Sequence, residues 1–348
     1  MRFLCKDCWM AHEAATLLSR CKRCEVNTRI ERLEPLTAKL GQSAARGPLV
    51  CKLHPHEPLD VYCGTCEREI PPRAVLHDRS IVALLGDTAA GKTSYLWVLS
   101  ELLRRPVNGV FIRQALGDSD EQMGRAASEL FDRGRFSATP TTDANVRNYA
   151  WELAAGDRGS TIVAFHDAAG EVWNKFAGLS RAAYDRFYRY LDLVGSVMFA
   201  IDGAHVAAVL EAEARRGLVA PQSRTALTHE IGIVDAVSRR IRARGERVPA
   251  AVLVTKADVL WDHPDWAAFR EDSGADEDTV NRTVRELLLK SGRMGLVRAL
   301  EETFSPVRYF AISAFGRDMS EPLRIEDLRP VRVADPLLSL LGNVVARM

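Results

Sequence analysis

Residues 86–93 have the types and the spacing of a loop that binds phosphate groups. The pattern G-x-x-x-x-G-K-[ST] is matched by Gly86, Asp87, Thr88, Ala89, Ala90, Gly91, Lys92 and Thr93. The glycines allow main-chain N–H groups to face phosphate oxygens. The ammonium of Lys92 would reach the β- and γ-phosphates, and the hydroxyl of Thr93 would bind Mg2+. The sequence therefore predicts a binding site for a nucleoside triphosphate.

The segments that flank this loop are predicted to be a strand before it and a helix after it. Ile81–Leu85 is a short apolar run of the kind that forms a buried strand. From Ser94 to Leu103 the residues favour a helix, with apolar side chains at helical spacing. A helix that begins at the loop would direct its N-terminus toward the anion. We count Ser94 among the nucleotide-binding residues.

The cysteines form a second chemical pattern. All seven lie within the first 66 residues, and six of them form C-x-x-C pairs. In a reducing compartment such pairs are typical of zinc ligands rather than disulfides. We expect one tetrahedral zinc site with the ligands Cys5, Cys8, Cys21 and Cys24. The ligands expected for a second site are Cys51, His54, Cys63 and Cys66, with His56 as the alternative to His54. His12 is expected to face solvent.

Length and composition limit the class of protein. A chain of 348 residues is long enough for about two domains. The net charge of +1 gives no whole-protein field that favours nucleic acid. The sequence has no run of apolar residues long enough for a membrane span, and its start lacks the apolar core of a secretory signal. We expect a cytoplasmic protein.

The distribution of cysteines and prolines predicts where the domains meet. Two prolines at positions 71 and 72 follow the last cysteine pair. We expect zinc-binding modules over residues 1–72, with the first site within 1–30 and the second within 48–70. A nucleotide-binding domain is expected over residues 77–348, with a helical insertion at about 203–248.

In the second domain, apolar runs alternate with helical segments, which predicts an α/β fold with a mostly parallel sheet and helices on both faces. The expected strands are Ile81–Leu85, Val107–Ile112, Val146–Leu153, Thr161–His166, Ser196–Ile201, Ala250–Thr255 and Val307–Ile312. The expected helices are Gly91–Leu103, Asp120–Arg133, Ser180–Leu191, Ala204–Arg215, Thr228–Arg242, Asp276–Ser291 and Leu296–Thr303, with a final helix from Asp335. Ligands of such sheets bind where the parallel strands end.

Three further motifs fall at expected strand ends. Asp167, in a D-x-x-G pattern with Gly170, follows one strand and would hold Mg2+ through water. The sequence Thr255-Lys256-Ala257-Asp258 follows another strand, and a carboxylate at Asp258 would accept hydrogen bonds from the N1–H and N2–H groups of guanine. After the last strand come Ser313 and Ala314, whose main-chain N–H groups would meet guanine O6.

The order of these motifs along the chain resembles that of P-loop GTPases of the TRAFAC class, which includes translation factors and Ras-like proteins. The resemblance covers about residues 78–320 and implies GTP, GDP and Mg2+ as ligands. The cysteine-rich start, a Thr-Pro-Thr-Thr sequence at 139–142 and the long segment after Asp202 are similar to those of bacterial double-GTPases, which implies a second GTPase or an activating protein as partner. Residues 51–66 resemble the first half of a B-box finger, but its remaining ligands are missing, so one zinc ion is expected there.

The resemblance also implies a mobile threonine that closes on Mg2+ when GTP is bound. Thr142 and Thr141 are the candidates, with Thr139 behind them. Glu171 stands where Ras-like enzymes have the glutamine that orients the attacking water, so we expect slow hydrolysis. An arginine that speeds the reaction would come from a partner or from the chain itself, where the candidates are Arg125, Arg133, Arg135 and Arg147.

Two functions follow from these observations. In the first, the protein is a GTP-hydrolysing switch in which Lys92, Thr142 and Glu171 act on the phosphates, and zinc modules dock a protein partner. In the second, it is a nucleotide-gated scaffold with negligible turnover. A nucleic-acid partner is disfavoured because acidic residues offset the basic residues of the zinc modules.

Overall fold

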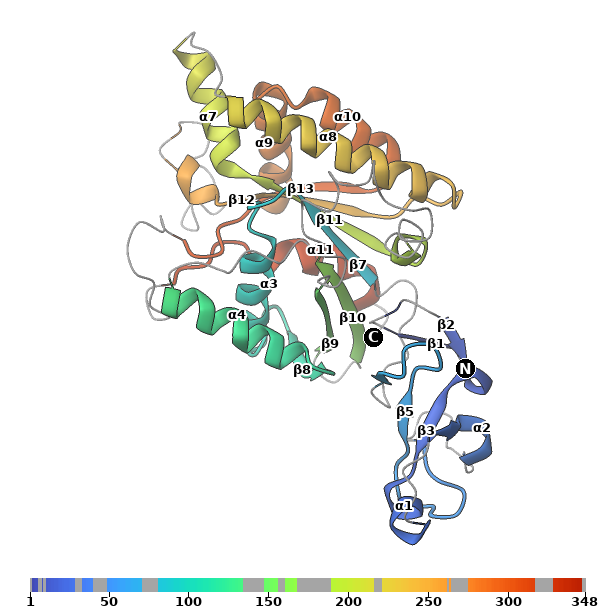
Figure 1. Cartoon of the computed structure of the whole chain (residues 1–348). Coiled ribbons are helices and arrows are strands. Elements are labelled where there is room, and N and C mark those ends of the chain that lie inside the picture. The colour runs from blue at the N-terminus through green and yellow to red at the C-terminus, as the bar shows by residue number, and fades with distance from the viewer. Residues whose placement is uncertain are drawn as a thin grey trace.

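The computed structural model describes residues 2–5, 8, 11–28, 33–39, 49–70, 81–133, 147–155, 160–167, 189–215, 221–261, 263, 275–316 and 328–345. Its largest feature is a seven-stranded sheet in the order β13-β12-β11-β7-β10-β9-β8 (Figure 1). The strands are β7 (Ile81–Gly86), β8 (Val110–Leu116), β9 (Arg147–Ala155), β10 (Ser160–Asp167), β11 (Ser196–Asp202), β12 (Ala250–Thr255) and β13 (Val307–Ala311).

The five strands from β13 to β10 run parallel, whereas β9 and β8 are antiparallel to their neighbours. The mostly parallel α/β sheet predicted from the sequence is therefore confirmed. The prediction for β8 is displaced along the chain, because Val107 instead forms an antiparallel bridge with Val110. Asn108 and Gly109 between them have φ angles of 50° and 81°, which make a tight turn before the strand begins.

Helices cover both faces of this sheet (Figure 1). Their bounds are α3 (Lys92–Leu102), α4 (Ser119–Arg133), α7 (Gly203–Ala214), α8 (Pro221–Arg242), α9 (Glu277–Lys290), α10 (Met294–Thr303) and α11 (Asp335–Val345), with the short 3-10 helices η5 (Arg189–Asp192) and η6 (Ala257–Leu260). Alternate residues of each strand serve the two layers, as the period of a strand requires. In β7, for example, Ala83 belongs to the cluster with α8, α9 and α10, and Leu84 belongs to the cluster with α3 and α11.

Helices α7 and α8 occupy the segment for which a helical insertion is expected. Helix α8 packs against α10 and also contacts β7, the strand that leads into the phosphate loop. A fully buried ion pair fixes it: the Nε atom of Arg293 donates to an Oε atom of Glu230 at 2.9 Å. Among the helices that the structure describes, none combines the length and apolar character needed to cross a lipid bilayer.

The cysteine-rich part has two small antiparallel sheets of its own (Figure 1). Strands β1 (Arg2–Leu4) and β2 (Ala11–Glu13) form one, and the 3-10 helix η1 (Ala14–Thr16) follows β2. The other has the order β4-β3-β5-β6, with the bounds β3 (Leu18–Arg20), β4 (Glu34–Pro35), β5 (Asp60–Tyr62) and β6 (Glu69–Ile70). Helices α1 (Lys22–Thr28) and α2 (Leu36–Lys39) complete this part.

Candidate functional site

The phosphate loop follows β7 and bends sharply at its glycines. Gly86 has φ of 142°, and a Cβ atom there would lie 2.4 Å from the carbonyl oxygen of Ala200 on the neighbouring strand. Gly91 caps the start of α3 with φ of 72°. These two positions therefore need glycine, one for close approach and both for their backbone angles.

The ammonium of Lys92 lies inside the loop. Its Nζ atom donates to the carbonyl oxygens of Gly86 at 3.0 Å and Asp87 at 2.8 Å, and the side chain is buried. Burial lowers the pKa of this lysine, and the nearby carboxylates of Asp167 and Asp87 oppose that shift. A buried cation among main-chain dipoles is suited to an incoming phosphate, which can replace these carbonyl partners.

Two of the residues expected to hold Mg2+, Thr93 and Asp167, lie together. The Thr93 hydroxyl donates to a carboxylate oxygen of Asp167 at 3.0 Å. They come from the start of α3 and the end of β10, where the parallel strands β7 and β10 both end. A hydroxyl beside a carboxylate is an oxygen donor set that fits Mg2+. The other predicted phosphate-sensing residues, Gly170, Glu171 and the threonines 139, 141 and 142, lie outside the described residues.

The residues predicted to recognise guanine are also adjacent. Ser313, after β13, donates its hydroxyl to the carboxylate of Asp258 on η6. The same Ser313 oxygen accepts from the main-chain N–H of Gly316 at 2.9 Å. The main-chain N–H of Ser313 donates to the Val331 carbonyl, so that donor is used within the protein, and Ala314 follows it in the chain.

Thr255 joins the two halves of this site. Its buried hydroxyl lies 3.0 Å from two carbonyl oxygens, that of Ala90 in the phosphate loop and that of Ile201 at the end of β11. Thr255 was predicted among the nucleotide-binding residues, and its contacts place it as a support of the loop. Because the guanine motif begins at this residue, the two motifs are held at a fixed separation.

Two side chains at the site were missed by the sequence analysis. Asp202 ends β11 and accepts a 2.7 Å hydrogen bond from the ammonium of Lys256. This bond fixes the lysine next to Thr255, the residue that supports the phosphate loop. The place of Asp202 at a strand end was a usable signal. His229 on α8 lies 3.3 Å from the carboxylate of Asp87, and no local pattern joins residues so far apart in the chain.

His166, by contrast, belongs to the core. Its imidazole is buried, and one ring nitrogen lies 2.8 Å from the side-chain oxygen of Asn148. The ring of Tyr190 packs on it at a centroid distance of 3.5 Å. Burial lowers the pKa of His166 to about 3, which keeps the imidazole neutral.

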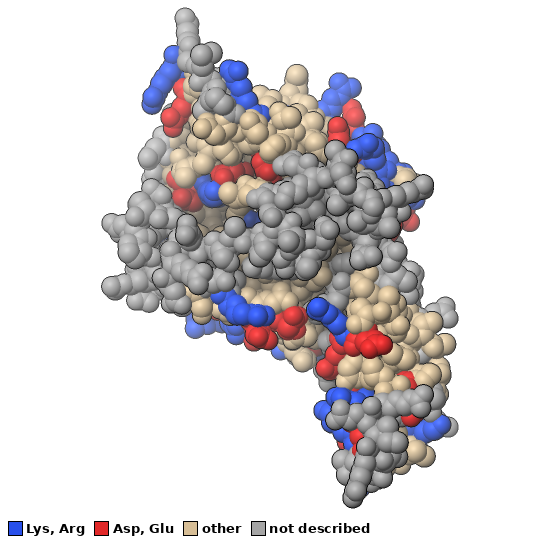
Figure 2. Space-filling view, in the orientation of Figure 1, with Lys and Arg blue, Asp and Glu red and all other residues tan. Residues whose placement is uncertain are grey.

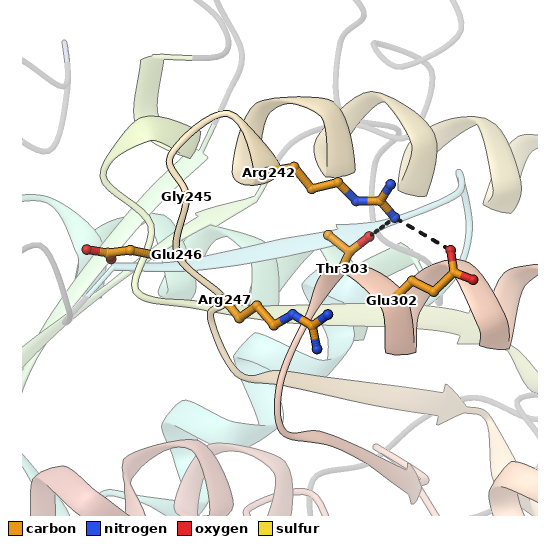
Figure 3. Close-up of a pocket in the computed structure, with 6 residues that line it drawn as sticks. All are labelled: Arg242, Gly245, Glu246, Arg247, Glu302 and Thr303. Atoms are coloured by element: carbon orange, nitrogen blue, oxygen red, sulfur yellow. Dashed lines mark hydrogen bonds and ion pairs between the residues drawn. The ribbon is translucent and has the colours of Figure 1, made fainter.

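The surface has a pocket away from the phosphate loop, and its charged side chains are of both signs. A pocket lined by Arg242, Gly245, Glu246, Arg247, Glu302 and Thr303 lies where α8 and α10 end, before β12 and β13 begin (Figure 3). It is therefore at the opposite edge of the sheet from the phosphate loop. On the face in Figure 2, acidic and basic side chains of the described residues lie next to one another.

The metal-binding side chains form two groups, but the predicted grouping is wrong. Each predicted site combined ligands that lie close together in the sequence. In the structure, one group consists of Cys5, Cys8, Cys63 and Cys66. The other consists of Cys21, Cys24, Cys51 and His54, which lie between Cys8 and Cys63 in the sequence. We call the first the outer group and the second the inner group, after this order in the sequence. Within each group, the ligand atoms all lie within 4.8 Å of one another. All eight predicted ligands belong to these groups, with different partners from those predicted.

The pairing of β3 with β5 explains this grouping. The two strands are antiparallel, with Leu18 opposite Tyr62 and Arg20 opposite Asp60. Cys21 therefore leaves one end of the strand pair, where residues 51–54 lie, and Cys63 leaves the other end, near the first cysteine pair. The length of the paired strands separates these two ends, so Cys21 lies too far from the first cysteine pair to share one tetrahedral ion with it, and Cys63 lies too far from residues 51–54.

Two histidines near these groups have different roles. His54 Nδ1 lies 3.4 Å from the Cys24 sulfur and 3.6 Å from the Cys21 sulfur, whereas His56 is exposed, so His54 is the ligand in this arrangement. His12 is buried, and the expectation that it faces solvent is wrong. Its Nε2 atom lies 3.1 Å from the Cys63 sulfur because β2 pairs with β1 beside the outer group.

The sulfurs need a cation to be stable as thiolates at these distances. The Cys24 and Cys51 sulfurs are 3.7 Å apart, as are those of Cys5 and Cys66. Burial, and then the neighbouring sulfurs, raise the pKa of Cys24 and Cys66 to about 12. Soft ligands in two compact tetrads fit Zn2+, which would stabilise the thiolates and with them the fold of this small part.

Comparison with known proteins finds a matching family model and similar solved structures. The family model described as Double-GTPase 2 matches residues 80–324. No curated protein matches the sequence. Similar solved structures include the signal recognition particle receptor SRb-GTP/SRX complex from Chaetomium thermophilum, at 12% identity over 68% of this chain and 94% of that chain, with a TM-score of 0.33. The S. cerevisiae Ski7 GTPase-like domain, bound to GTP, is 13% identical over 76% of this chain and 50% of that chain, with a TM-score of 0.37.

The grouping of zinc ligands can be tested by cobalt substitution. Cys63→Ser should destroy the outer group and leave the inner one, so the remaining Co2+ should show the absorption of a three-sulfur, one-nitrogen site. Elemental analysis should find two zinc ions in the wild type and one in this variant. A remaining four-sulfur spectrum would instead support grouping by sequence neighbours. Cys21→Ser is the matched control, because it should leave the four-sulfur site.

Proposed function

Because this chain belongs to the Double-GTPase 2 family, we propose that it is a GTP-binding switch that hydrolyses GTP with Mg2+. The observation that carries the proposal is the hydroxyl of Thr255. It binds the phosphate loop at Ala90, and it stands at the head of the guanine motif that contains Asp258. One nucleotide can then contact both motifs.

The phosphates would be held by the loop itself. Lys92 would exchange its carbonyl partners for the β- and γ-phosphates, while main-chain N–H groups at the start of α3 face the same anion. Thr93 and Asp167 would hold Mg2+, Thr93 directly and Asp167 through water. When bound, the metal neutralises charge that develops on the phosphate oxygens. Gly170 and Thr142 would close on the γ-phosphate and metal.

Guanine would be selected by Asp258. Its carboxylate would accept hydrogen bonds from the N1–H and N2–H groups of the base, which adenine does not have. In the present structure Ser313 donates to that carboxylate and so holds it in place. Lys256, fixed by Asp202, would cover the face of the base with its aliphatic stem.

Turnover is proposed to be slow and stimulated by a protein partner. Glu171 is a carboxylate where related enzymes have glutamine, so it would place a negative charge near the γ-phosphate. The partner would be a second GTPase or an activating protein, and it would bind to the zinc modules. We propose that the protein acts in the cytoplasm. The same glutamate favours the second candidate function, a nucleotide-gated scaffold without turnover.

Asp258→Asn should change the base preference. The new amide can donate to the C2 carbonyl of xanthine, so affinity for xanthine nucleotides should rise and that for guanine nucleotides should fall by roughly 10–100-fold or more. Equilibrium binding of both nucleotides to both proteins measures this. Asp235→Asn, an exposed aspartate on α8, is the control. Unchanged preference in Asp258→Asn would refute its role.

Glu171→Gln should leave single-turnover GTP hydrolysis unchanged or faster, because glutamine can both orient water and donate to the γ-phosphate. A fall of roughly 10^2–10^4 with intact GTP affinity would contradict this and make Glu171 the group that activates water. Hydrolysis that is undetectable in the wild type, with and without cell extract, would support the scaffold instead.

A further inference from the structure

A carboxylate in the phosphate loop creates an electrostatic problem. Asp87 is the second residue of the loop, and its main-chain carbonyl accepts a hydrogen bond from Lys92 at 2.8 Å. Its side chain is largely covered, with an exposed fraction of 18%. An ionised carboxylate so close to a bound polyphosphate would repel it unless the carboxylate is held away and neutralised.

The structure holds both oxygens of this carboxylate. One accepts from the main-chain N–H of Thr88 at 2.7 Å, and the other lies 3.3 Å from Nδ1 of His229. Because an ionised carboxylate can only accept, the His229 nitrogen must be the donor. One carboxylate oxygen thus faces helix α8, while the other is bound by the main chain of the loop itself.

Helix α8 is positioned firmly enough to keep that contact. Glu230, the next residue after His229, is 2% exposed, and its carboxylate receives two hydrogen bonds from the guanidinium of Arg293, at 2.9 and 3.2 Å. At the start of the helix, Ser223 lies 3.3 Å from a ring nitrogen of His205 on α7. A fully buried ion pair next to His229 restricts both the rotation and the translation of this part of α8.

We propose that His229 is a positioning residue for nucleotide binding, through which the helical insertion holds the Asp87 carboxylate away from the phosphates. The role rests on the proposed function, because it needs a guanine nucleotide in the loop. It also gives the insertion a part in the site: a movement of α8 would release Asp87 toward the phosphates and weaken their binding. A partner that docks on α8 would thereby alter nucleotide affinity.

A double-mutant cycle tests this role with GDP and Mg2+ as the probe, measured by calorimetry on the full chain. His229→Ala should weaken GDP binding roughly three- to tenfold, the scale of one typical hydrogen bond at a partly exposed site. Asp87→Asn should bind GDP more tightly than the wild type, because the repelling charge is gone. In the Asp87→Asn background, His229→Ala should cause no further loss.

Two variants separate this role from a general effect on the fold. His229→Asn keeps a donor near the place of Nδ1 and should restore part of the affinity. His205→Ala removes an imidazole that contacts the same helix at Ser223, and it should bind GDP like the wild type. Thermal unfolding without nucleotide shows whether each variant is folded.

The possible results have distinct meanings. Equal losses from His229→Ala in both backgrounds, or no loss in either, would overturn the inference alone. If the wild type binds neither GDP nor GTP, the proposed function fails and the inference fails with it.

Discussion

The buried ammonium of Lys92 is the constraint around which the rest of the site is organised. A buried cation is costly unless polar groups surround it, and here the carbonyls of Gly86 and Asp87 do so. Those carbonyls can reach the ammonium only because the chain curls immediately after β7, which requires glycine at the start and end of the loop. A central strand and a following helix then hold the curl in place.

The parallel sheet supplies the remaining contacts because five of its strands end at the same edge. Asp167, Asp202, Thr255 and Ser313 each end or follow a different strand, and each is buried. Their partners follow neighbouring strands: Asp167 accepts from Thr93 at the start of α3, and Asp202 accepts from Lys256 after β12. Thr255 joins the phosphate and base motifs through its hydrogen bond to Ala90, although the two motifs are far apart in the sequence.

Features with a local cause could be predicted from the sequence. The phosphate loop, Asp167 and the Asp258 motif follow from residue types at strand ends, and they lie where the pattern placed them. The cysteine and histidine side chains that gather in two groups could also be predicted, from their local spacing, but their grouping could not. C-x-x-C spacing allows either arrangement, and the choice depends on the antiparallel pairing of β3 with β5, which is a long-range feature. The contact between His229 and Asp87 likewise depends on how α8 crosses the sheet.

Competition for the nucleotide site of the wild-type protein is the most direct test of its proposed preference for guanine nucleotides. Purified protein with Mg2+ and labelled GDP would be challenged with GTP and, separately, with ATP. We predict one site per chain, from which GTP displaces the label and ATP does so only at concentrations at least about 100-fold higher. Equal displacement by ATP and GTP would contradict this prediction, because the Asp258 and Ser313 arrangement would then have no role in choosing the base.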